Sequence, residues 1–267
     1  MHPLLAAMLV MAATWKSWWW YLERVGGSPE EAAALALTAV LLGVLGFARR
    51  HQIAAAHSAP LWTIALALTV YAGSTFVLPP IGRAAIAIAA TLFAFHVAIF
   101  KERPPVAFWG LVALSLPVLP SLQFVLGYPL RVVSAAVTVT MLQAHGFGVE
   151  RQGTFLAWRD EVIQFDAACS GVNMLWAGLM LTLMGCVLFR LRALQVIVAM
   201  MLSVIVVVVA NVLRTSSLFY LEAGFIPQAP SWWHEAIGIA AFVLSAAMIL
   251  WLLRKLREWE PFVWAPK

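Results

Sequence analysis

The chain contains a series of long apolar stretches, and these constrain its fold more than any single motif. A helix that crosses a membrane needs about 20 mostly apolar residues. By that rule we predict spanning helices near residues 4–21, 30–48, 61–79, 83–100, 105–126, 172–189, 193–213 and 235–253. The expected fold is an all-α integral membrane bundle of about eight transmembrane helices, forming one domain over residues 1–267.

Composition excludes a soluble globule. Hydrophobic residues make up 63% of the chain and charged residues 11%, whereas soluble domains carry about 25% charged residues. The net charge of +5 comes from short basic groups between apolar stretches rather than from one basic surface. We therefore expect membrane lipid as a partner and no nucleic acid. No C-x-x-C motif is present, so the sequence gives no support for a zinc or thioredoxin-like site, and we expect no cofactor or metal.

The basic groups also predict the orientation. They follow the second, fourth and sixth spans and the last one, as Arg49–Arg50, Lys101–Arg103, Arg190–Arg192 and Arg254–Arg257. Short cytoplasmic loops are enriched in Lys and Arg. With eight spans and both termini inside, all four groups lie in the cytoplasm. The aromatic run Trp18–Tyr21 is expected to anchor the first span at the membrane interface.

The segment 127–171 differs from the spans around it. Pro117 and Pro120 should kink the fifth span or end it early. Residues 130–145 have a helical pattern with a polar stripe, which favours an interfacial or re-entrant helix. The stripe consists of Arg131, Ser134, Thr138 and His145. Two short strands, Thr154–Trp158 and Val162–Phe165, are predicted to form a small non-cytoplasmic cap.

Three polar residues fall at the same-side ends of three apolar helices. Cys169 stands in DAACSGVNMLW, Arg214 in VVVVANVLRTSS and His234 in SWWHEAIGIA. The predicted topology places all three on the non-cytoplasmic side. A thiol, a guanidinium and an imidazole are the parts of a cysteine acyl-transfer site.

The chemistry of such a site follows from the position of each group. Cys169 precedes the sixth span by about two residues, and Ser170 and Gly171 are good N-cap residues. The positive end of the helix dipole then favours a thiolate. His234 can take the thiol proton and later protonate a leaving amine. Arg214 can supply fixed donors for an oxyanion.

Each of these residues also has a structural interpretation. A lone Cys near a helix start is usually inert, Arg214 is favoured by the dipole at a helix C-terminus and by snorkelling to the interface, and interfacial His is common. Asn211 either shares the pocket with Arg214 or holds two helices together through a hydrogen bond.

Two further residues lie within apolar runs. Cys186 is expected to be a buried small hydrophobe. His96 is either functional or a neutral histidine that hydrogen-bonds a neighbouring helix.

Two other functions fit a chain of this class. The first is a non-enzymatic membrane protein, such as a transporter subunit or an assembly scaffold. Transporters normally place their polar groups near the midplane, whereas here they cluster at one boundary. The second is a thiol oxidoreductase, which is disfavoured because a second exposed cysteine is missing.

Three motifs, in this order and spacing, resemble the exosortase/archaeosortase family. They are ACSGVNML opening one span, NVLR ending the next and HEAIG opening the one after, and LPSLQFVLGYPLRVVSAAV is also similar. The resemblance covers about residues 115–250. It implies a multi-pass cysteine protease or transpeptidase in the inner (plasma) membrane of a Gram-negative bacterium, with its site facing the periplasm.

The same resemblance implies a substrate and a catalytic set. The substrates would be exported proteins with a C-terminal signal made of a short motif such as PEP, a transmembrane helix and a basic cluster. The family's Cys, Arg and His match Cys169, Arg214 and His234.

Overall fold

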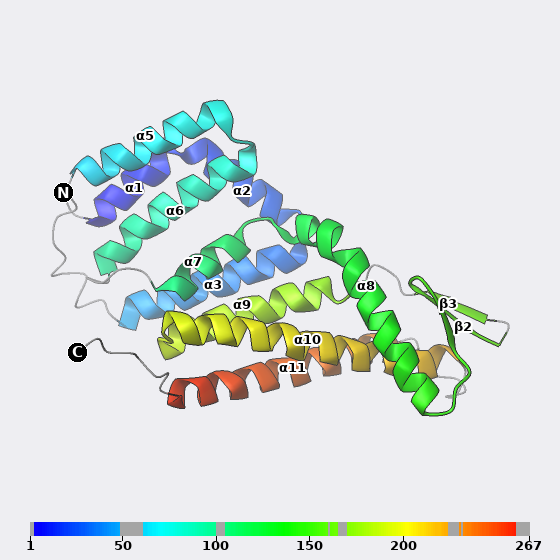
Figure 1. Cartoon of the computed structure of the whole chain (residues 1–267). Helices are drawn as coiled ribbons and strands as arrows, with labels where there is room; N and C mark the ends of the chain where they lie inside the picture. The colour runs from blue at the N-terminus through cyan, green and yellow to red at the C-terminus, as the bar shows by residue number, and fades with distance from the viewer. Residues whose placement is uncertain are drawn as a thin grey trace, which may run out of the picture. The chain divides into compact units, whose positions relative to one another are not determined.

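The computed structural model describes residues 3–48, 61–99, 105–159, 161–164, 170–223, 230 and 232–259. They form two compact units, Met1–Val118 and Leu119–Lys267, both mainly helical (Figure 1).

The first unit is built around one helix with small side chains. Its helices are α1 (Pro3–Ala13), α2 (Trp15–Gly26), α3 (Pro29–Ala48), α5 (Leu61–Val77), α6 (Pro80–Ile99) and α7 (Val106–Ser115). The helix α6 packs against α1, α2 and α5, and its Ala84 and Ala87 are fully buried. Small side chains let the neighbouring helices approach closely.

The predicted first span is two helices rather than one. The chain turns at Thr14, whose hydroxyl donates back to the carbonyl of Val10 over 2.8 Å. Such a bond from a mid-helix Thr commonly bends a helix. Tyr21 is not an interfacial anchor: it is 1% exposed and donates its hydroxyl to the carbonyl of Ser115 over 2.9 Å. Trp19, at 67% exposure, remains compatible with that role.

The second unit contains a helical bundle and a small sheet. Its elements are α8 (Leu119–Ala144), β1 (Glu150–Gln152), β2 (Phe155–Trp158), β3 (Glu161–Gln164), α9 (Val172–Phe189), α10 (Ala193–Glu222) and α11 (Trp233–Glu258). The helices α9, α10 and α11 pack pairwise, and α8 packs against α9 and α10 (Figure 1).

The direction of the bundle helices follows from contacts at one end. Gln195 near the start of α10 donates to the carbonyls of Leu256 and Trp259 at the end of α11, both over 2.8 Å. The guanidinium of Arg257 lies 5.8 Å from the ring centre of Phe189, the last residue of α9. The end of α9, the start of α10 and the end of α11 therefore meet. The opposite ends of the three helices meet at the other end of the bundle.

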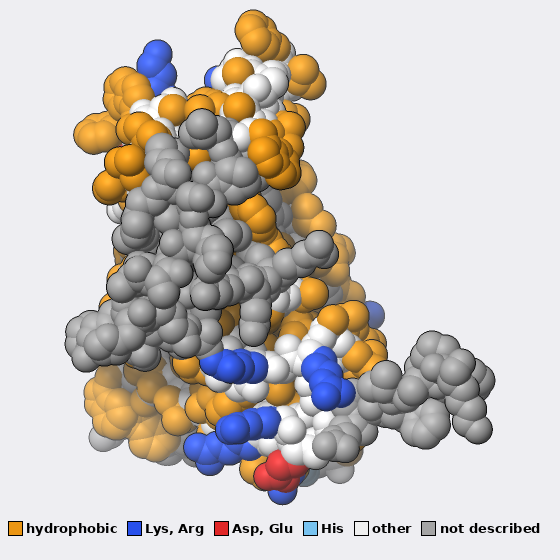
Figure 2. Space-filling view, turned by 90° about the vertical axis from the view of Figure 1, so that its left-hand side faces the viewer, with side chains coloured by type: hydrophobic (Ala, Val, Ile, Leu, Met, Phe, Trp, Pro, Cys, Tyr) orange, Lys and Arg blue, Asp and Glu red, His pale blue; other side chains and the backbone are white. Residues whose placement is uncertain are grey.

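Basic side chains gather at the end where Gln195 lies, as Figure 2 shows. All of them are exposed, and they are Arg190, Arg192, Arg254, Lys255 and Arg257. These are two of the four basic groups that the sequence assigns to the cytoplasm. The other two, at Arg49–Arg50 and Lys101–Arg103, lie outside the described residues.

Two glycines of α9 let the bundle close. A methyl group added at Gly178 would lie 2.8 Å from Cγ2 of Val207 on α10. One added at Gly185 would collide with Leu253 of α11. Because only glycine leaves this space, the backbone of α9 lies close to both neighbours.

The region after the fifth span folds differently from the prediction. The helix α7 ends at Ser115, so the expected early end before Pro117 is confirmed. A new helix, α8, then runs through Pro129 to Ala144. Residues 130–144 are therefore part of a continuous 26-residue helix, not a separate interfacial one. A proline at the start of a helix is tolerated because its missing N–H has no helical partner there, which explains how Pro120 fits into the first turn of α8.

The four residues of the polar stripe have three different environments. Ser134 and Thr138 are buried and bond to α10, and His145, just after α8, is exposed. The side chain of Arg131 donates to the carbonyl of Gly127 over 3.2 Å, within its own helix.

Both predicted strands are present, together with a third strand before them, and the position of the sheet on the non-cytoplasmic side stays a prediction. The strands β1, β2 and β3 form an antiparallel sheet in that order. Leu156 and Trp158 of β2 pack into a buried cluster with Val139 of α8 and Phe219 of α10. The cap is thus held on α8 and on the last turns of α10. Strand β1 could not be predicted from the sequence, because Glu150–Gln152 has three exposed side chains and no alternation of apolar and polar residues.

Among the described residues, four helices are long and apolar enough to cross a membrane: α8, α9, α10 (over Ala193–Leu221) and α11. Shorter apolar helices cover Ile64–Val77, Pro80–Ala94 and Val106–Ser115. The count of eight spans stays a prediction.

Candidate active site

The start of α9, the last turns of α10 and the start of α11 meet at the end of the bundle away from the basic groups. This is where the sequence places Cys169, Arg214 and His234. The helices α9 and α11 both point their N-terminal N–H groups toward this end, whereas α10 points its last carbonyls toward it and Glu235 lies in the first turn of α11. The guanidinium of Arg214 adds a full charge.

Arg214 reaches across to α11. A methyl group added at Gly238 would lie 3.3 Å from Nε of Arg214 and 3.7 Å from one of its terminal nitrogens. Nε itself is buried. The guanidinium therefore lies against the backbone of α11 at a position where a larger side chain would press on it.

The position of Arg214 along its helix differs from the prediction. The span expected to end at residue 213 continues to Glu222, so Arg214 lies about two turns before the helix end. The extension is stabilised because Leu218 and Phe219 are buried against α8 and the cap. The helix dipole acts mainly within the last turn, so it does not explain Arg214 at this position.

His234 opens α11, as expected. The helix begins at Trp233, and His234 is half-buried in its first turn. Gly238 follows four residues later, and residues spaced by four lie on the same face of a helix. The guanidinium of Arg214 thus meets α11 one turn from His234, a rise of about 6 Å.

Cys169 lies outside the described residues, which resume at Ser170. Gly171 is the N-cap residue of α9 and has a φ of 75°, in the left-handed region that favours glycine. The hydroxyl of Ser170 accepts from the N–H of Val172 over 3.3 Å. The expected N-cap at this position is confirmed. Cys186 is 1% exposed within α9, which confirms the expectation of a buried small hydrophobe.

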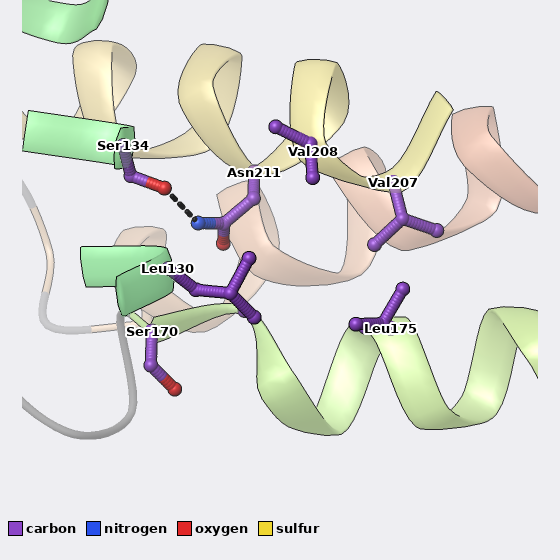
Figure 3. A pocket seen from close by; sticks show the side chains of 8 residues that line it. Leu130, Ser134, Ser170, Leu175, Val207, Val208 and Asn211 are labelled. Atoms are coloured by element: carbon purple, nitrogen blue, oxygen red, sulfur yellow. Dashed lines mark hydrogen bonds between the residues drawn. The ribbon is translucent and has the colours of Figure 1, made fainter. Parts of the chain in front are cut away.

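Of the two alternatives for Asn211, the structure confirms the hydrogen bond between helices, and Arg214 does not line the pocket that Asn211 lines. Asn211 is 3% exposed and donates from Nδ2 to the hydroxyl of Ser134 on α8 over 3.0 Å (Figure 3). It also lines a small pocket between α8, α9 and α10. The other residues that line this pocket are Leu130, Ser134, Ser170, Gly171, Leu175, Val207 and Val208.

Two contributors were not identified as such from the sequence. In the sequence, Gly238 is only one position of the motif HEAIG and Gly171 is only an N-cap residue. Both touch α10, through Arg214 and Asn211. The available signal was a small residue at each helix start beside a polar residue of the next helix. The side chain of His96 lies outside the described residues. Among those described, no group of three His, Cys, Asp or Glu side chains could hold a metal ion.

Comparison with known proteins identifies the family. The family described as transmembrane exosortase matches residues 1–251, which extend over both compact units. No curated protein and no solved structure matches the chain. The match extends beyond residues 115–250, where the motifs lie, and it agrees with a mainly helical protein that carries long apolar helices. This membrane protein therefore belongs to the transmembrane exosortase family.

Proposed function

We propose that this protein is a membrane cysteine protease or transpeptidase that processes the C-terminal sorting signal of exported proteins. Membership of the exosortase family supports the proposal. The observation that carries it is the guanidinium of Arg214, seated against Gly238 one turn from His234. Both lie at the end of the bundle where the chain leads from residue 169 into α9.

Cys169 is the nucleophile of the proposed reaction. Two peptide units span at most about 7 Å, so its Cα stays within that distance of Gly171. The dipole of α9 favours a thiolate here. The sulfur attacks the carbonyl carbon of the scissile peptide bond, and a C–S bond forms as the carbonyl oxygen takes the negative charge.

His234 and Arg214 act on the two sides of this intermediate. Arg214 donates hydrogen bonds to the oxyanion. His234 takes the thiol proton and returns it to the leaving amine as the C–N bond breaks. A thioester and a released C-terminal segment result. An acceptor amine or water then attacks the thioester, gives its proton to His234 and frees the thiolate.

The proposed substrates carry a short motif of the PEP-CTERM kind, a transmembrane helix and a basic cluster. Their helix would dock against the bundle, and the scissile bond would lie just outside the membrane. We place the protein in the inner membrane of a bacterium with the site facing the periplasm. The separation of the exposed basic end from Arg214 and His234 supports this orientation.

The direct test is substitution of the nucleophile. Cys169→Ala should abolish processing of a co-expressed substrate without loss of folded protein in the membrane. Cys186→Ala is the matched control and should leave processing nearly unchanged, because this thiol lies in the interior of α9. Processing is measured by the size of the substrate in membranes with equal protein abundance. Wild-type processing by Cys169→Ala would reject covalent catalysis at this residue.

The orientation is tested by labelling single cysteines in a Cys169→Ala/Cys186→Ala background. Val162 of β3 is 68% exposed, and Arg192 is exposed between α9 and α10. Val162→Cys should react with a membrane-impermeant maleimide added to intact spheroplasts. Arg192→Cys should react only after the membrane is opened. Equal labelling of both from outside would remove the proposed site from the periplasm.

A further inference from the structure

The backbone at Gly171 is pressed against the side chain of Asn211. A methyl group added at Gly171 would lie 2.7 Å from Cγ, 2.9 Å from Nδ2 and 2.9 Å from Oδ1 of Asn211. All three distances are shorter than any ordinary carbon contact. The left-handed φ of 75° independently strains any larger residue at this position. The first turn of α9 therefore rests directly on an amide of α10.

The side chain of Asn211 is itself held from behind. Its Nδ2 donates to the hydroxyl of Ser134 over 3.0 Å, and both residues are 3% exposed. One turn further along α10, the hydroxyls of Thr215 and Thr138 bond over 3.0 Å, again between α10 and α8. With two buried hydrogen bonds fixing α10 against α8, the amide has little freedom to yield when α9 presses on it.

The same stretch of α10 carries Arg214. Asn211 and Arg214 are three residues apart, so they lie on neighbouring positions of one helix face, about 4.5 Å apart along the axis. One touches the residue two positions after Cys169, and the other touches α11 one turn from His234. A single helix turn thus contacts both neighbouring helices at glycines.

We propose that Asn211 is a positioning residue. Its amide is a stop that sets how closely the start of α9 approaches α10, and so sets the distance from the thiol of Cys169 to the guanidinium of Arg214. The inference rests on the proposed function, because it concerns the geometry of that site. Asn211 itself takes no part in bond making.

The expected kinetic signature is a loss of turnover rather than of binding. A displacement of about 1 Å between reacting groups costs up to about a hundredfold in rate. In Asn211→Ala the stop is removed, so kcat per folded molecule should fall by about 10- to 100-fold. KM should change by less than about threefold, because the proposed docking of the substrate helix does not involve Asn211.

A second variant tests the contact itself. Gly171→Ala should lower kcat strongly, since its methyl group collides with Asn211. In the double variant Gly171→Ala/Asn211→Ala that collision is absent, so the two losses should be less than multiplicative. Ser134→Ala should give a smaller loss of kcat by freeing the amide, and Ser134→Thr, which keeps the hydroxyl, should restore most of it.

The matched control is Gly178→Ala, on the same helix. Its methyl group would lie 2.8 Å from Val207, a collision of similar size two turns away from the site. It should lower thermal stability as Gly171→Ala does while kcat per folded molecule stays near that of the wild type. If Asn211→Ala behaves like Gly178→Ala, with reduced stability and unchanged kcat, Asn211 is only a packing residue and the proposal is overturned.

The experiment distinguishes failure of the positioning role of Asn211 from failure of the proposed function. Inactive Cys169→Ala with fully active Asn211→Ala overturns the positioning role and leaves the proposed function standing. Active Cys169→Ala overturns both. The proposal is supported when Cys169→Ala is inactive, Asn211→Ala loses kcat with KM retained, and the double variant shows coupling.

Discussion

Basic side chains at the two ends of the α9–α10–α11 bundle have different surroundings. At one end the basic residues are exposed, and they are Arg190, Arg192, Arg254, Lys255 and Arg257. At the other end Arg214 buries its Nε and lies against the backbone at Gly238. Exposed basic groups at a helix end need only water or lipid headgroups around them. A guanidinium that lies against a neighbouring helix has less freedom to move, as the oxyanion donor that we propose requires.

The largest expected difference between the two ends is the response to lysine. Arg214→Lys keeps the charge but loses the planar fork of donors. We expect processing to fall on the order of a hundredfold, as loss of one oxyanion donor typically does. Arg254→Lys, at the exposed end, should be silent. The processing rate is measured at matched membrane abundance. Near-wild-type activity of Arg214→Lys would leave Cys169 and His234 as a dyad.

A smaller effect is expected from the surface on which Arg214 rests. Gly238→Ala places a methyl group 3.3 Å from Nε, so the guanidinium must shift by a few tenths of an ångström. We expect a loss of about tenfold in kcat, because catalytic geometry is sensitive to such shifts. The control is Ile239→Ala, since Ile239 is 64% exposed on the next position of α11. Equal activity of both variants would mean that the close approach of Arg214 to Gly238 does not affect turnover.

The predictable parts of the fold are the helices whose ends are marked by local sequence signals. The span 172–189 matches α9 because Gly171 precedes it and Arg190 adopts the left-handed C-cap conformation after it. The break at Thr14 and the continuation of α10 to Glu222 were not predictable in the same way. Mean hydropathy records how apolar a stretch is, but it does not record a hydroxyl that bends a helix or a cap that buries Phe219.

In the candidate site, too, some features follow from local sequence and others depend on how the helices pack. The helix starts at Gly171 and His234 follow from local sequence, because N-cap residues and aromatic pairs mark them. The seating of Arg214 on Gly238 and of Gly171 on Asn211 depends on how α9, α10 and α11 pack. Packing of this kind is set by contacts between distant residues, so the sequence could indicate only that small residues were available.

The basic end of the bundle is closed by a buried glutamine. Gln195 is 6% exposed and closes that end by donating to the carbonyls of Leu256 and Trp259, while its Oε1 accepts from the N–H of Arg192 over 2.8 Å. Gln195→Ala removes both of these hydrogen bonds, and a typical intramolecular hydrogen bond contributes about 0.5–1.5 kcal/mol to stability.

We expect the apparent melting temperature of Gln195→Ala to fall by a few degrees, while kcat per folded molecule stays unchanged. Fluorescence-detected thermal unfolding of the purified protein measures the first quantity, and processing at matched abundance measures the second. The reason for the separation is distance along the helix: Gln195 and Arg214 are 19 residues apart on α10, a rise of about 28 Å. A fall in kcat without loss of stability would mean that the two ends are coupled through α10, and the contrast between a structural end and the proposed catalytic end would no longer hold.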